Sequence, residues 1–251
     1  MKKYLSIIVC GLLIASSFNV KATDIWSDDG GSSVIYDGAN YSIFSFSWNR
    51  TKAKKAHYSG FGLVFSNLNG LDDYDVNLKL GKSYSVLLNF MTFNLPIDHH
   101  WLFFSGLGVD WSRYHFKGDV ALKDVNGEAQ FVLDEYNRSY KSSKLLAYYF
   151  TIPVAFEYQI KAKGRRKFFV NGGAEALIKC YSKSQTDIRT PDGLKKYDHK
   201  DLNIYPFNFR LFAKVGLGSL SLTGYYQPIS MFSEGGGPDV NPWGMGIMLN
   251  F

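Results

Sequence analysis

The last eleven residues of the sequence are Asn241-Pro-Trp-Gly-Met-Gly-Ile-Met-Leu-Asn-Phe251. Every second position holds a large apolar residue, and most residues between them are small or polar; the apolar set is Trp243, Met245, Ile247, Leu249 and Phe251. Because side chains alternate between the two faces of a β-strand, one face of this strand is apolar throughout. A tilted strand of about 9–11 residues crosses a bilayer. We therefore expect a membrane-spanning strand whose open edge pairs with an earlier strand to close a barrel.

The first residues have the features of a secretory signal peptide. Lys2 and Lys3 precede an apolar run that is shorter than the ~20 residues of a spanning helix, and Ala22 is the small residue expected before a cleavage site. Cleavage after Ala22 would remove Cys10 and leave Cys180 as the one cysteine. This excludes an internal disulfide and a thiol-rich metal site.

Composition favours an outer-membrane barrel over a soluble all-β protein. Aromatic residues make up 17% of the chain, and there are 24 glycines. Aromatic rings form belts at membrane interfaces, and glycines let strands bend around a narrow barrel. Removal of the signal peptide lowers the formal net charge from +6 to +3, because Lys2, Lys3 and Lys21 leave without any acid. The mature chain is thus only mildly basic.

The same alternation recurs upstream and predicts seven earlier strands. They lie within residues 57–67, 83–90, 101–113, 146–159, 168–179, 205–216 and 220–226. Each has one face that is compatible with lipid. Together with 241–251 they make eight strands, and a strand-like segment at 42–48 extends the range to ten at most.

The connections between these strands are of two kinds. Three are tight turns, at 96–100, 161–167 and 218–219, and four are long and polar, at 67–82, 117–143, 182–201 and 229–240. Short periplasmic turns and long extracellular loops are typical of outer-membrane barrels. We therefore predict an all-β fold, a closed antiparallel up-and-down transmembrane β-barrel of about eight strands in the outer membrane of a Gram-negative bacterium.

The predicted organisation has three parts. Residues 1–22 are the signal peptide, 23–56 are a periplasmic lead-in that contains the strand-like segment 42–48, and 57–251 are the barrel. Such a barrel has outer-membrane lipid and the outer-membrane insertion machinery as its partners.

Three segments carry a family resemblance: His57-Tyr-Ser-Gly-Phe-Gly-Leu-Val-Phe-Ser-Asn67, Phe104-Ser-Gly-Leu-Gly-Val-Asp-Trp111 and Tyr149-Phe-Thr-Ile-Pro-Val-Ala-Phe-Glu157. Over roughly residues 41–251, the chain resembles the PorT-like outer-membrane β-barrel domain family. The resemblance implies a barrel of eight strands or slightly more, and it brings no reaction and no catalytic motif. PorT itself is associated with the assembly of a protein-secretion system. An accessory role in a secretion or transport complex is therefore an alternative function.

Charged residues lie on faces that are expected to point into the barrel, namely Glu157, Glu175, Lys179, Arg210 and Lys214. Side chains just fill the interior of an eight-stranded barrel, which disfavours a porin-like channel. Buried charges are stable only when they are paired and hydrogen-bonded. We expect a structural plug in which Arg210 or Lys214 neutralises Glu175; a gated proton or ion path is the alternative.

The loops contain carboxylates that partly match two kinds of site. Asp73-Tyr-Asp-Val-Asn77 has the spacing of a calcium loop, but Leu78 replaces the required glycine and the distal glutamate is missing. Asp72 and Asp73 with Asp198-His199 are groups that an omptin-type protease uses, but they lie in loops rather than at strand ends. We predict no catalytic residue, no metal and no cofactor; a barrel enzyme acting on lipid or peptide is the weakest alternative.

Basic residues crowd the predicted periplasmic turn 161–167. Such turns attract anionic phospholipid with about 1 kcal/mol per charge. This explains the turn without nucleic acid, and a periplasmic protein partner is the alternative.

The longest loop contains a hairpin signal. Val120 and Leu122 precede Asn126-Gly127, and Phe131 follows. Asn-Gly favours a type I′ turn because both residues accept positive φ. We expect a hairpin that rises above the bilayer and offers its outer edge to a surface partner; a passive loop is the alternative. The predicted function is thus a non-enzymatic surface barrel whose loops contact a partner or stabilise the membrane.

Deletion of Phe251 tests whether the terminal strand is the signal that the insertion machinery recognises. That machinery must pair an apolar edge strand, so the deletion should reduce the folded, heat-modifiable protein in outer-membrane fractions. Unchanged assembly would show that the terminal strand has no special role.

Overall fold

A computed structural model describes residues 40–43, 55–133, 140–161, 167–190, 193–200 and 202–251. The predicted signal peptide lies outside the described residues, as do most of the lead-in and residues 162–166 of the basic turn. Residues 37–251 belong to one compact unit. Among the described residues, no helix is long and apolar enough to cross a membrane.

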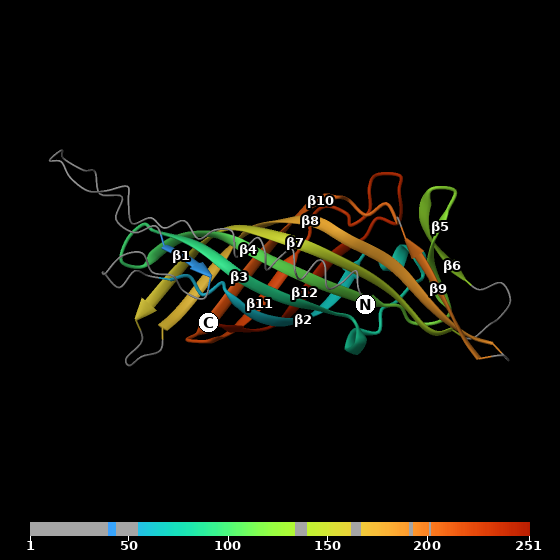
Figure 1. Cartoon of the computed structure of the whole chain (residues 1–251), viewed down its shortest axis with the longest axis horizontal. Coiled ribbons are helices and arrows are strands. Elements are labelled where there is room, and N and C mark those ends of the chain that lie inside the picture. Colours follow the sequence, from blue (N-terminus) through green and yellow to red (C-terminus); the bar gives the residue numbers. More distant parts are fainter. Residues whose placement is uncertain (1–39, 44–54, 134–139, 162–166, 191–192, 201) are drawn as a thin grey trace. The chain divides into compact units, whose positions relative to one another are not determined.

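Eight strands close into an antiparallel barrel (Figure 1). In ring order they are β2 (Gly60–Asn69), β3 (Tyr84–Pro96), β4 (Trp101–His115), β7 (Tyr140–Lys161), β8 (Lys167–Thr190), β10 (Phe207–Leu217), β11 (Leu220–Tyr226) and β12 (Asn241–Asn250). β12 closes the ring on β2, from Asn241 opposite Asn69 to Asn250 opposite Gly60. The predicted fold class is therefore confirmed, and the terminal strand pairs with the first strand of the ring.

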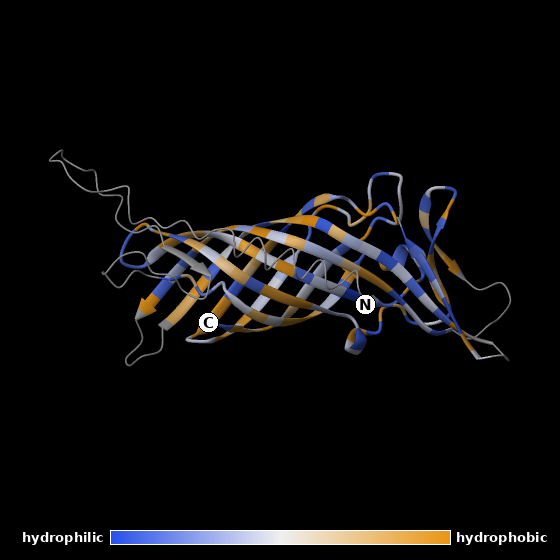
Figure 2. Ribbon diagram, in the orientation of Figure 1, coloured by the Kyte–Doolittle hydropathy of each residue, from blue (hydrophilic) through white to orange (hydrophobic). Residues whose placement is uncertain are grey.

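The outer wall of the barrel is apolar, and Figure 2 shows hydrophobic residues recurring along the strands. On β12, the outward residues from Trp243 to Leu249 are 38–66% exposed. Aromatic pairs mark the two ends of the wall: the rings of Trp101 and Tyr158 are 5.1 Å apart, and those of Tyr148 and Tyr181 are 5.6 Å apart. Such girdles lie at the two interfaces of a membrane.

β8 continues beyond the membrane and folds back as β9 (Gly193–Lys200). Their pairing runs from Lys183 opposite Lys200 to Thr190 opposite Gly193. The prediction of a polar loop over 182–201 is therefore wrong, because most of this segment is a strand hairpin. Its buried face consists of Ser182, Ser184, Thr186 and Ile188, and small polar residues in these positions conceal the alternation that identified the other strands.

The hairpin predicted around Asn126-Gly127 is present as β5 (Val120–Val125) and β6 (Glu128–Leu133). Asn126 and Gly127 have φ values of 55° and 85°, as a type I′ turn requires. The expected free edge is absent over at least part of β6, since the Ala129 amide donates to the Gly236 carbonyl (2.8 Å). The hairpin is surrounded by water rather than lipid, so its apolar face is buried against other loops.

The buried hairpin face belongs to an apolar cluster that we call the extracellular cap. It combines inward residues at the extracellular ends of the strands with residues of the loops, including the 3-10 helix η1 (Leu71–Tyr74). A second 3-10 helix, η2 (Leu80–Lys82), follows η1 in the chain. Its largest members are Leu68, Leu71, Tyr114, Phe116, Leu122, Leu145, Tyr149, Leu177, Leu202, Ile204, Met231 and Phe232. The lumen is thus continuous with a packed apolar core outside the membrane.

A short strand lies at the periplasmic end of β3. β1 (Asn40–Ile43) pairs there, from Asn40 opposite Asn94 to Ile43 opposite Met91. It occupies the edge that β2 leaves open, because β2 starts at Gly60 opposite Asn89. Of the strand-like segment 42–48, residues 42 and 43 are therefore in a strand, and 44–48 lie outside the described residues.

Two glycines of the C-terminal hairpin test the closure of the barrel. A Cβ at Gly246 would lie 2.1 Å from the Leu63 carbonyl oxygen of β2, whereas at Gly224 the nearest atom would be 3.6 Å away. Gly246→Ala should lower the free energy of unfolding by about 1–3 kcal/mol through overpacking. Gly224→Ala should unfold near the urea midpoint of the parent. Identical midpoints for both variants would contradict the close approach of β12 and β2.

Candidate functional site

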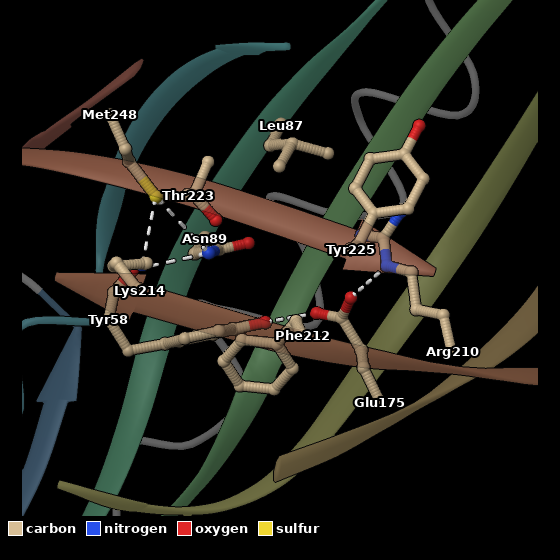
Figure 3. Close-up of a pocket in the computed structure, with 10 residues that line it drawn as sticks. All are labelled: Tyr58, Leu87, Asn89, Glu175, Arg210, Phe212, Lys214, Thr223, Tyr225 and Met248. Atoms are coloured by element: carbon tan, nitrogen blue, oxygen red, sulfur yellow. Dashed lines mark hydrogen bonds and ion pairs between the residues drawn. The ribbon is translucent and has the colours of Figure 1, made fainter. Parts of the chain in front are cut away.

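Inward polar side chains form a network through the lumen (Figure 3). Within it lies a cavity with a volume of about 10 Å³, comparable to the space that one water molecule needs. Its polar lining includes Tyr58, Asn89, Glu175, Arg210 and Lys214. This part of the lumen is therefore packed with side chains.

Arg210 of β10 lies at the centre of the network. Its Nε donates to Glu175 Oε2 (2.5 Å), and its Nη1 pairs with Asp110 Oδ2. Strand register places Glu175 directly opposite Arg210, whereas Asp110 comes from β4. Exposure is 4% for Arg210, 1% for Asp110 and 3% for Glu175, so the three groups are shielded from water. A planar guanidinium with several donors can bridge two carboxylates in this way.

Hydroxyl groups satisfy the polar atoms beside this ion-pair triad. Ser112 donates to Asp110 (2.7 Å) and shares a hydrogen bond with Ser85 (2.6 Å). The Tyr225 hydroxyl lies 2.9 Å from Ser66 Oγ and 3.0 Å from Ser85 Oγ, and its ring centroid lies 4.5 Å from the Arg210 guanidinium carbon. The ring thus adds a cation–π contact to the two ion pairs.

Residues 55–59, which precede β2, enter the periplasmic end of the lumen; we call them the N-terminal plug. The His57 amide donates to Glu157 Oε2 (2.8 Å), and His57 Nδ1 lies 2.7 Å from Oε1. Asn171 and Gln159 also donate to Glu157, at 2.9 Å and 2.6 Å. The His57 ring stacks on Phe169 at 4.0 Å. Glu157 is fully buried, and these donors compensate for its lost hydration.

The plug also reaches the central triad. The Tyr58 hydroxyl hydrogen-bonds to Glu175, and Asn89 donates to the Tyr58 carbonyl (3.2 Å). Lys214 Nζ lies 5.0 Å from the centroid of the Tyr58 ring and 3.0 Å from Met248 Sδ. Among the described residues, Lys214 has no carboxylate within salt-bridge distance.

Four of the five residues predicted for the interior, Glu157, Glu175, Arg210 and Lys214, are buried in the lumen. Lys179 is the exception, because it is only half-buried and its Nζ donates to the Ile204 carbonyl (2.6 Å) beside the extracellular cap. A register shift between β7 and β8 lies next to Lys179. The backbone amide of Lys179 donates to the loop that precedes β10 instead of to a residue of β10.

Sequence reasoning missed Asp110 and the N-terminal plug. Asp110 could have been found, because it lies between the outward residues Val109 and Trp111 and therefore points inward. His57 and Tyr58 were expected at the start of the first strand, whereas β2 begins at Gly60 and both residues belong to the N-terminal plug.

The carboxylates of the loops lie apart from the lumen. Asp72 and Asp73 are in η1, and Asp198 of β9 forms a salt bridge with Lys183 (3.0 Å). The described residues contain no group of three or more His, Cys, Asp or Glu side chains that could hold a metal ion.

A family model for the outer membrane protein beta-barrel domain matches residues 44–232. The chain belongs to this family. An outer membrane β-barrel of this family resides in the Gram-negative outer membrane, as predicted. A similar solved structure is that of Ail, the attachment invasion locus protein of Yersinia pestis, with 11% identity, coverage of 77% of this chain and 99% of that chain, and a TM-score of 0.32. A search of curated proteins found no match.

Two cations on β10 provide a matched test of the network in this outer membrane β-barrel. Arg210→Met leaves Asp110 and Glu175 buried without their shared cation, and breaking a buried pair costs about 3–5 kcal/mol. Lys214→Met removes an equally buried cation that has no ion pair among the described residues, so it should lower the free energy of unfolding less. Glu175→Leu should lower the free energy of unfolding by an amount between those of the other two variants, because Arg210 keeps its ion pair with Asp110.

Urea unfolding in detergent micelles measures the three variants against the parent. Equal urea midpoints for Arg210→Met and Lys214→Met would contradict the pairing of Arg210 with Asp110 and Glu175.

Proposed function

We propose that the chain is a non-enzymatic surface barrel that presents a folded extracellular surface to a partner. The observation that carries this proposal is the contrast between the lumen of the barrel and the β8–β9 hairpin. The lumen is filled with paired and hydrogen-bonded side chains, whereas the β8–β9 hairpin extends into water beyond the membrane wall. A filled lumen provides no passage for a solute, so function is expected on the outside.

The lumen is occupied at three levels. The N-terminal plug binds Glu157 at the periplasmic end. In the middle, Arg210 of β10 pairs with acids of β4 and β8. The extracellular cap packs at the opposite end. These contacts support a structural role for the interior charges rather than a gated ion path. The same contacts account for the burial of Glu157, Glu175, Asp110 and Arg210 without assigning them catalysis.

β9 supplies the surface that the proposal requires. Among the described strands it pairs only with β8, and its Leu194 and Tyr197 side chains are each 43% exposed. The unpaired backbone groups of a strand edge in water can pair with another chain, and exposed apolar side chains beside them add contact area. The β5–β6 hairpin was the surface expected from the sequence, but its buried Val120 and Leu122 belong to the extracellular cap. We therefore place the partner surface on β8–β9.

An accessory role in a secretion or transport complex is the second candidate. It is supported by the anchoring of the N-terminal region at the periplasmic mouth, through β1 on β3 and through the N-terminal plug. A periplasmic partner would then contact this end of the barrel.

A cross-linked pull-down from native outer membranes distinguishes the two candidates. The Leu194→Ser/Tyr197→Ser variant removes the apolar side chains of β9, and Ile97→Ser removes a 58% exposed one from the periplasmic β3–β4 turn. We expect a stoichiometric partner that is lost from the β9 variant and kept by Ile97→Ser, with unchanged heat-modifiability of both. A partner that the β9 variant retains would refute the extracellular site, and loss with Ile97→Ser alone would favour the periplasmic role.

A further inference from the structure

A cluster of basic residues surrounds His115 at the extracellular end of β4. The strongest charges acting on its imidazole are all positive and come from Lys79, Arg113, Lys82 and Lys144. The fold brings them together: the Lys79 amide donates to the His115 carbonyl (2.7 Å), and strand register sets Lys144 of β7 opposite His115. Like charges repel, so a bound anion would stabilise this grouping.

Buried polar atoms in this cluster have no partner among the described residues. Nδ1 and Nε2 of His115 are both buried without a hydrogen bond, and so is Nε of Arg113. His115 itself is 4% exposed. Buried polar atoms of this kind are rarely unsatisfied. Of the charges that act on Lys144, Asp187 is negative and lies on β8, on the side of β7 away from β4, whereas Arg113, Lys196 and Lys183 are positive. The cluster therefore has the donors of an anion site and few acceptors.

Apolar and aromatic neighbours place the cluster at the headgroup level of the membrane. Arg113 follows the outward Trp111 by two residues, and its guanidinium carbon lies 5.9 Å from the centroid of the Tyr84 ring. Leu80, between Lys79 and Lys82, is 61% exposed. Outward aromatic residues mark the interface between acyl chains and headgroups. An exposed leucine beside lysines can contact acyl chains while the lysines reach the headgroups.

We propose that Lys79, Lys82, Arg113, His115 and Lys144 bind the phosphate-bearing headgroup of an outer-leaflet lipid. The guanidinium matches phosphate oxygens in a bidentate fashion, and the lysines add point charges. Leu80 and Trp111 lie where the acyl chains of that lipid begin, which favours a lipid over a soluble phosphate. This site does not include Leu194 or Tyr197 of the β9 partner surface, so either proposal can fail without the other.

Native mass spectrometry of the full mature chain in detergent micelles tests the site. The probes are diphosphorylated lipid A, the same lipid with both phosphates removed, and inorganic pyrophosphate. Arg113→Gln/Lys144→Gln should bind diphosphorylated lipid A roughly 30-fold more weakly, since each basic contact near a charged lipid surface contributes about fivefold. Lys195→Gln/Lys200→Gln carries the same charge change on exposed positions of β9 and should bind like the parent.

Two further variants keep the test decisive. Lys82→Gln replaces an exposed side chain and can be measured if the double variant does not fold. It should weaken lipid binding about fivefold. Leu80→Ser should weaken binding of the lipid and leave that of pyrophosphate unchanged. Equal binding of the dephosphorylated lipid, equal losses for the β9 control, or pyrophosphate bound as tightly as the lipid would each overturn the proposal.

Discussion

The structure depends on one constraint: an eight-stranded barrel is narrow enough for side chains to fill its lumen, and any charge placed there must be satisfied by its neighbours. Arg210 meets this constraint by pairing with Glu175 on the neighbouring strand and with Asp110 on β4. Tyr58 of the N-terminal plug donates a hydrogen bond to Glu175, and Ser112 donates one to Asp110. The triad thus connects separate strands and the segment that precedes them.

The direction in which apolar side chains point reverses along the long axis of the strands. Within the membrane wall, Ile247 and Leu249 face outward, and charged groups such as Arg210 face inward. Above the wall, Leu122 and Phe232 face inward and form the extracellular cap. The solvent outside decides the orientation in each case, because lipid accepts an apolar surface and water does not. The basic cluster around His115 lies at this change of solvent, where charged headgroups are available.

The sequence predicted those parts of the fold on which lipid imposes a pattern. All eight spanning strands follow from the alternation of large apolar residues, and the Asn126-Gly127 turn follows from its demand for positive φ. Ser184 and Thr186 are buried on β8 above the membrane, but they carry no hydrophobic alternation, so the β8–β9 extension was missed. The burial of Leu122 was missed because it depends on loops that are distant in sequence.

The candidate site could be predicted in part for the same reason. Glu175 and Arg210 lie within alternating runs, which fixes their inward direction and, through strand order, their proximity. His57 and Tyr58 were expected within the first strand but lie before β2, and Lys179 lies beside a register shift, so periodicity gave the surroundings of neither correctly. Strand alternation defines faces well; it does not define where a strand slips or where a flanking segment enters the lumen.

Side chains fill the lumen, and its periplasmic end holds the N-terminal plug. A disulfide between Ser59→Cys and Thr92→Cys, in a Cys180→Ser background, tests this arrangement directly, because the native hydroxyl oxygens lie 2.8 Å apart inside the barrel. Mild oxidation of native membranes should produce an intramolecular bond, seen as a reductant-sensitive shift of the folded band. Folded protein that never forms this bond would place residues 55–59 outside the lumen and contradict the account.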